Sequence, residues 1–119
     1  KHANVHNSVY LLLWEDELST SQRRRFEAKK IGIWNGEREN EHSTRYECAK
    51  MIMNTKLVQE NNYWTKENPS SKCERKDAVR MVERAIHEPV GFSWENMREY
   101  ITRGEMAEMI MLAINAKNA

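Results

Sequence analysis

The sequence predicts an all-α fold, a single bundle in which three similar helical motifs share one core. Three observations favour it. The chain of 119 residues has only four Gly and two Pro, too few for the many turns of an all-β protein. Its four Trp, four Tyr and seven Met are too many large apolar groups for a disordered chain. Its apolar positions recur at helical spacing in three related segments.

These segments align without gaps, and each carries an arginine followed two positions later by an acid. The segments are residues 43–52, 73–82 and 101–110. Their arginines are Arg45, Arg75 and Arg103, and their acids are Glu47, Asp77 and Glu105. Such matches at nearly equal spacing indicate an internal repeat. We therefore divide the domain 1–119 into motifs of about 19–56, about 57–87 and about 88–117.

Each repeated segment has the features of a helix start. In two of them, a threonine and a glutamate three positions later fit the capping box, which satisfies two free backbone N–H groups. The pairs are Thr44 with Glu47 and Thr102 with Glu105. The middle segment has Glu74 in place of threonine. Because Ser71 with Glu74 offers a box one turn earlier, the middle helix is expected to begin sooner.

After each start, the apolar residues form a one-sided stripe that a lone helix cannot bury. The last helix is the exception, because Met109, Met111 and Leu112 widen its stripe, and it is expected to be the most buried. Three such helices are expected to pack about a shared axis. The sequence therefore predicts a pseudo-threefold, spindle-like arrangement.

Further helices are expected outside the repeated segments. They are residues 19–31, residues 93–100 and residues 9–18, the last as helix rather than strand. Gly32 is expected to end the first of these, and Arg23 to Arg25 are expected to lie mostly in solvent. The polar or Pro-containing stretches expected as loops are 37–42, 60–71 and 87–91.

The chain offers few groups for metal or catalytic chemistry. Cys48 and Cys73 have no metal-ligand spacing, and both one disulfide and two buried thiols fit them. The four histidines are scattered, so neither a metal nor a cofactor is predicted. Because no nucleophile motif or Gly-rich phosphate loop is present, the chain is predicted not to be an enzyme.

Residues 31–36 (IGIWNG), a short polar loop and then residues 43–47 (STRYE) resemble the S-layer homology family. The motif of that family runs from a helix through a GI-x-x-G turn and a polar loop into a TRAE-like helix start. Residues 101–105 are the closest copy of this start, and residues 73–77 are a degenerate one. The resemblance implies a three-pronged helical spindle that attaches proteins non-covalently to secondary polysaccharides of bacterial cell walls.

The resemblance also implies a ligand site in the grooves between the prongs, where the motif arginines lie. On this chain these are Arg45, Arg103 and Arg75, with Glu47 and Glu105 beside them in the predicted site. A guanidinium matches the carboxylate of a pyruvyl ketal or a uronic acid. The other interpretation is that each arginine pairs with a neighbouring acid and holds the prongs together.

Two tryptophans belong to the same prediction. Trp34, in the Gly-bounded turn, and Trp94 can offer flat faces to sugar rings. The alternative is that both pack against the motif helices, because Trp is highly buried on average.

The net charge and the hydropathy limit which kinds of partner are predicted. Lys and Arg number 19 against 18 Asp and Glu, and a net charge of +1 gives little long-range attraction for nucleic acid. No apolar run approaches the roughly 20 residues of a membrane span, so no membrane partner is predicted.

We therefore predict a non-catalytic module that binds an anionic cell-wall glycan and attaches a larger protein to the bacterial surface, or works in a phage particle, in either case outside the cell. The first alternative is a structural assembly protein of a phage virion or surface layer, with the Met-rich last helix partly at an interface with like or other subunits. The second is a helical nucleic-acid binder that uses Arg23 to Arg25 and loses affinity steeply with salt.

Overall fold

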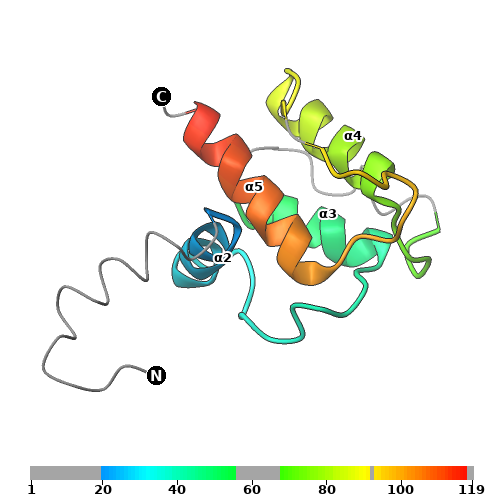
Figure 1. Cartoon of the computed structure of the whole chain (residues 1–119), viewed down its shortest axis with the longest axis horizontal. Helices are drawn as coiled ribbons and strands as arrows, with labels where there is room; N and C mark the ends of the chain where they lie inside the picture. Colours follow the sequence, from blue (N-terminus) through cyan, green and yellow to red (C-terminus); the bar gives the residue numbers. More distant parts are fainter. Residues whose placement is uncertain (1–19, 56–67, 92, 118–119) are drawn as a thin grey trace, which may run out of the picture.

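The computed structural model describes residues 20–55, 68–91 and 93–117, and within them the chain is all-α (Figure 1). The helices are α2 (Thr20–Lys30), α3 (Arg45–Met53), α4 (Arg75–Ile86) and α5 (Arg103–Lys117). No strand occurs in these ranges, so the all-α part of the predicted fold class is confirmed. The helix expected over residues 9–18 lies outside the described residues, as does most of the loop expected over 60–71.

The bundle is centred on α5, which contacts each of the other three described helices, whereas α2 packs on α5 alone (Figure 1). α3 and α4 also contact each other. With neighbours on more than one side, α5 buries residues 106–111 in an unbroken run, and the prediction that the last helix is the most buried is confirmed. Its methionines, Met106, Met109 and Met111, lie inside the core of the chain itself. These three side chains are therefore not available to a subunit interface, and an interface role for the rest of the helix stays a prediction.

α3, α4 and α5 all begin at the aligned arginines, and the short segments before them pair in a closed cycle. Three isolated β-bridges join the segments: His42 with Thr102, Thr44 with Lys72, and Glu74 with Tyr100. Between them, Ser43 N–H donates to Ile101 O (2.9 Å), Ile101 N–H to Cys73 O (2.8 Å) and Cys73 N–H to Ser43 O (3.2 Å). These three residues are fully buried. Each helix start is thus held by both of the others.

The caps of α3 and α5 are the predicted capping boxes. The Thr44 hydroxyl accepts from Glu47 N–H at 3.1 Å, and the Glu47 carboxylate accepts from Thr44 N–H at 2.9 Å. Thr102 and Glu105 repeat this at 3.2 and 3.0 Å. Both boxes are confirmed.

α4 has no side-chain cap, and the expected early start is wrong, because this helix begins at Arg75 after Glu74. The preceding segment stays extended because its backbone is used elsewhere. Ser71 O accepts from Arg45 N–H (2.8 Å), and Cys73 N–H donates to Ser43 O. A helical turn at Ser71 would break both bonds.

Replacing Glu74 by threonine is expected to raise the free energy of unfolding by about 1 kcal/mol. A threonine hydroxyl can accept from Asp77 N–H, which now donates to the Glu74 carbonyl. The change also removes a buried carboxylate oxygen that has no hydrogen bond and only a long ion pair, with Lys76 at 3.8 Å. Urea denaturation at neutral pH measures the difference. Thr44→Ala, which deletes an existing cap, is expected to change stability by a similar amount in the opposite direction. An unchanged midpoint for Glu74→Thr would contradict the prediction.

The remaining helix ends and loops agree with the sequence-based expectations. α2 ends before Gly32, whose φ of +88° lets Ile33 N–H reach back to Ala28 O (3.0 Å), as expected. The predicted loop over 37–42 and the break over 87–91 also hold, since neither contains a helix. α4 ends at Ile86, and its C-cap, His87, lies in the left-handed region.

The prediction of a short helix over residues 93–100 is wrong, because the structure has no helix there. Here the Asn96 side chain accepts from Arg98 N–H (3.1 Å) and so stabilises a turn. The carbonyls of Met97 and Glu99 accept from the first N–H groups of α4, those of Lys76 and Arg75. This turn-forming segment thus supplies acceptors for two N–H groups at the start of α4, which have no partner within that helix.

A buried ion pair fastens α2 to α5. The Glu108 carboxylate accepts from Ser21 Oγ at 2.7 Å and from Arg25 Nη2 at 3.3 Å. Arg25 is only 19% exposed, so its expected position in solvent is wrong, because a carboxylate that is 7% exposed requires a partner. Gly104 makes room for the guanidinium: a Cβ there would lie 2.7 Å from Arg25 Nη1.

None of the helices in the described ranges has the length and apolar character needed to cross a membrane.

Candidate functional site

Each of the three aligned arginines reaches across to the acid of another motif. Arg45 lies 3.8 Å from Asp77, Arg103 lies 2.6 Å from Glu47, and Arg75 forms an ion pair with Glu105. The arginine side chains are between 12% and 22% exposed. The interpretation that each arginine pairs with a neighbouring acid is confirmed. A role of these arginines in binding ligand stays a prediction.

Arg75 is enclosed by protein groups. Its guanidinium donates to Glu105 through Nε (3.2 Å) and Nη2, and through Nη1 to Glu99 Oε1 (2.9 Å) and Asn96 O (3.1 Å). The Trp94 ring lies 5.2 Å from the guanidinium carbon and packs against the core. These contacts indicate that Arg75 holds the second and third motifs together.

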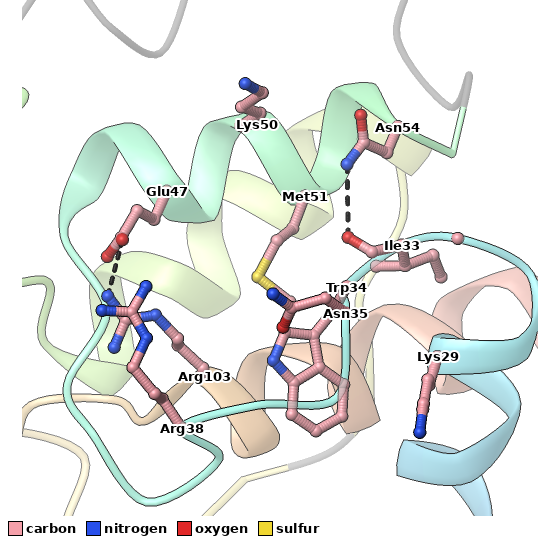
Figure 2. A pocket seen from close by; sticks show the side chains of 11 residues that line it. Lys29, Ile33, Trp34, Asn35, Arg38, Glu47, Lys50, Met51, Asn54 and Arg103 are labelled. Atoms are coloured by element: carbon pink, nitrogen blue, oxygen red, sulfur yellow. Dashed lines mark hydrogen bonds and ion pairs between the residues drawn. The ribbon is translucent and has the colours of Figure 1, made fainter.

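Arg103 has a different setting, because it lines a pocket of about 490 Å³ (Figure 2). Its Nη2 donates to Glu47 at 2.6 Å and its Nη1 to His42 O at 3.2 Å. Trp34 lies in the same pocket. The structure thus brings together three of the predicted site residues. The remaining four, Arg45, Arg75, Trp94 and Glu105, do not line this pocket.

The pocket lies between one face of α3, the loop after α2 and the start of α5 (Figure 2). α3 contributes Glu47, Lys50, Met51 and Asn54, which share a helix face because they are spaced three and four residues apart. The loop contributes Gly32 to Asn35 and Arg38, and α2 contributes Lys29.

Sequence reasoning missed the basic residues of this pocket, namely Lys29, Arg38 and Lys50. A signal for Lys50 was present, since it is one helical turn after Glu47. The sequence contains no such signal for Arg38, because its position in the pocket depends on a backbone φ of +54°, which an arginine seldom adopts.

The loop that carries Trp34 is fixed by several local bonds. Trp34 Nε1 donates to Glu37 O (3.0 Å), and Asn54 Nδ2 donates to Ile33 O (3.2 Å), which ties the loop to α3 (Figure 2). Gly36 has a φ of +85°, and a Cβ there would come within 2.5 Å of Lys29 Cδ. The positive φ favours glycine at this position, and the Lys29 side chain packs against it.

The two capping glutamates are held in the ionised form. Burial by itself raises the pKa of Glu47, but the hydrogen bonds from Thr44 and Arg103 outweigh burial and lower it below the ordinary value of 4.5. Burial likewise raises the pKa of Glu105, and the hydrogen bonds from Arg75 and Thr102 lower it overall. Both carboxylates therefore favour folding while they are charged.

Acid is expected to weaken the fold through these two groups. Because their pKa values are lower in the folded chain than in the unfolded one, their contribution is fully present above the ordinary value of 4.5 and is lost as pH falls through the folded values. The double variant Glu47→Gln, Glu105→Gln is expected to be less stable at pH 7 and to lose less on acidification. Urea midpoints between about pH 7 and about pH 3 measure this. Equal slopes for both proteins would show that other groups carry the acid sensitivity.

The chemistry of the pocket favours an anion with polar surroundings. Four side chains are basic, Lys29, Arg38, Lys50 and Arg103, against the single acid Glu47. Across the described residues, no group of three or more His, Cys, Asp or Glu side chains gathers in a way that could hold a metal ion.

Relatives add no further guidance on this site. Comparisons of the chain with known protein families, with curated proteins and with solved structures each found no match.

Proposed function

We propose that this chain is a non-catalytic module that binds an anionic glycan of the bacterial cell wall, and that the pocket of Figure 2 receives an acidic group of that glycan. One observation carries the proposal. Four basic side chains and one acid line a single pocket, beside an indole, in a chain whose net charge is only +1. The excess of basic side chains gives the pocket a positive electrostatic potential, which attracts an anion.

The available groups suit a carboxylate-bearing sugar. Arg38 is 57% exposed, and its ion pair with Glu41 is long at 4.0 Å, so its planar donors are accessible to a ligand. Lys50 forms no ion pair with a described acid and contacts the Tyr46 ring at 5.9 Å. The half-buried Trp34 offers an apolar surface to the C–H face of a sugar ring, and Asn35 lies next to it with an amide for hydroxyl groups.

We further infer that the three motifs are related by a pseudo-threefold axis. Two sets of contacts support this inference. The backbone bonds among Ser43, Cys73 and Ile101 run in one direction around a closed cycle. The ion pairs Arg45–Asp77, Arg75–Glu105 and Arg103–Glu47 run around the same cycle, each from one motif to the next. In this arrangement the Arg75–Glu105 pair joins the second motif to the third. The Arg103–Glu47 pair joins the third motif to the first and also lines the open pocket.

The resemblance to S-layer homology proteins indicates the biological setting. In that setting the module attaches a larger protein to secondary wall polysaccharide at the cell surface or on a phage particle. The test is sedimentation of the chain with bacterial wall fragments, before and after acid removal of their secondary polymers. Wild-type protein is expected to bind the native fragments and to lose binding to the stripped ones.

Matched charge variants test the pocket itself. Arg38→Gln with Lys50→Gln is expected to weaken binding at least about tenfold, because each change removes a charged donor worth about 1 kcal/mol or more. Arg80→Gln with Arg98→Gln removes the same charge from exposed positions outside the pocket and is expected to change binding little. Failure of wild-type protein to bind native walls, or equal losses in both double variants, would overturn the proposal.

A further inference from the structure

Two cysteines that take no part in the pocket lie where the first and second motifs meet. Cys48 is in the first turn of α3, and Cys73 is in the extended segment before α4; both are fully buried. The segment of Cys73 runs beside the start of α3, because Cys73 N–H donates to Ser43 O and Thr44 forms a bridge with Lys72. Both residues carry free thiols.

The two thiols are neighbours in the core. The interaction with the Cys73 thiol, together with burial, raises the pKa of Cys48 well above its ordinary value. Two further contacts cross the same interface: the backbone bond from Arg45 to Ser71 and the Arg45–Asp77 ion pair. The folded chain therefore brings the two buried cysteines to one junction between two motifs.

We propose that Cys48 and Cys73 form an intramolecular disulfide when the chain folds in the presence of a disulfide oxidant, and that this bond links the first motif to the second. The balanced step is a thiol–disulfide exchange with oxidised glutathione. One cysteine thiolate attacks the glutathione disulfide, which gives a mixed disulfide and releases one glutathione. The other cysteine attacks the mixed disulfide, which closes the Cys48–Cys73 bond and releases the second glutathione. The two protons lost by the cysteines pass to the two glutathione thiolates.

Because both sulfur atoms are buried, the exchange occurs while the chain folds or opens, and folding then selects the linked form. The disulfide also stabilises the fold. The free energy by which the folded state favours the bond, relative to the unfolded state, is the amount by which the bond raises the free energy of unfolding. This inference is independent of glycan binding, and its test uses no glycan.

The experiment refolds the full chain from urea in a glutathione redox buffer, then traps free thiols with iodoacetamide and measures the intact mass. Wild-type protein is expected to take up no alkyl group and to be lighter than the reduced chain by two hydrogen atoms. Equilibration at several glutathione ratios, in native buffer and in urea, gives the effective concentration of one thiol at the other. We expect this to be about a hundredfold higher in native buffer.

Cys48→Ala and Cys73→Ala are the controls, because neither can close the bond and each leaves one thiol to be trapped. Folding of the wild-type chain with two alkylated cysteines after equilibration would overturn the proposal. Equal effective concentrations in native buffer and in urea would do the same, as would disulfide-linked dimers in place of the linked monomer.

Discussion

Replacing Arg75 by alanine is expected to lower the free energy of unfolding by about 3 kcal/mol. The side chains of Arg75 and Glu105 are each 13% exposed and form a two-point ion pair. Removing the guanidinium leaves the Glu105 carboxylate poorly solvated, with only its capping bond to Thr102 N–H at 3.0 Å. It also removes the donors to Glu99 and Asn96, which anchor the turn before α5.

Urea denaturation at neutral pH measures this loss, and Arg80→Ala is the matched control. Arg80 is on the same helix, is 69% exposed and forms one long ion pair, with Asp77 at 4.0 Å. Its removal is expected to change stability by less than about 0.5 kcal/mol. Similar losses for the two variants would mean that the loss of a positive charge from α4, and not the pairing of motifs, sets the effect.

Replacing Glu108 by alanine is expected to lower the free energy of unfolding by about 3 kcal/mol and to loosen α2 from α5. Glu108 accepts from both Ser21 and Arg25 of α2, and α5 is the only described helix that α2 contacts. Without the carboxylate, Arg25 keeps only a weak partner, Glu39 at 3.8 Å. Hydrogen exchange of the α2 amides is therefore expected to accelerate more than that of α4.

A conservative change separates charge from packing at this position. Glu108→Gln keeps an acceptor for the Ser21 hydroxyl and is expected to lose less stability than Glu108→Ala. Glu27→Ala, an exposed acid on α2, controls for the loss of negative charge. Unaltered α2 exchange in Glu108→Ala would show that apolar packing alone docks this helix.

The helices of the repeated segments could be predicted because their signals are local. Thr44 and Glu47 cap the helix that they begin, and the apolar residues after them recur at helical spacing. The starting point of α4 could not be predicted in this way. It depends on backbone bonds to Arg45 and Ser43, from another part of the chain, and these override the local box at Ser71.

The candidate site was predictable only in part. The aligned arginines and Trp34 stand out in the sequence, but the sequence does not tell which arginine faces a pocket. That depends on Gly36 and Arg38, which bend the loop after α2 toward α3. The misjudged solvation of Arg25 has the same origin, since its partner Glu108 is far along the chain and is recognisable only once α2 lies on α5.

The closed cycle of backbone bonds before α3, α4 and α5 also determines the smallest piece of this protein that can fold. A fragment without the third motif leaves the Ser43 amide without the Ile101 carbonyl and the Cys73 carbonyl without the Ile101 amide, at an open and apolar edge. The loss of these bonds and the exposure of the apolar edge are expected to make a two-motif fragment unstable. We therefore expect the three helix starts to form and unfold together, and a fragment that lacks one of them to be much less stable than the whole chain.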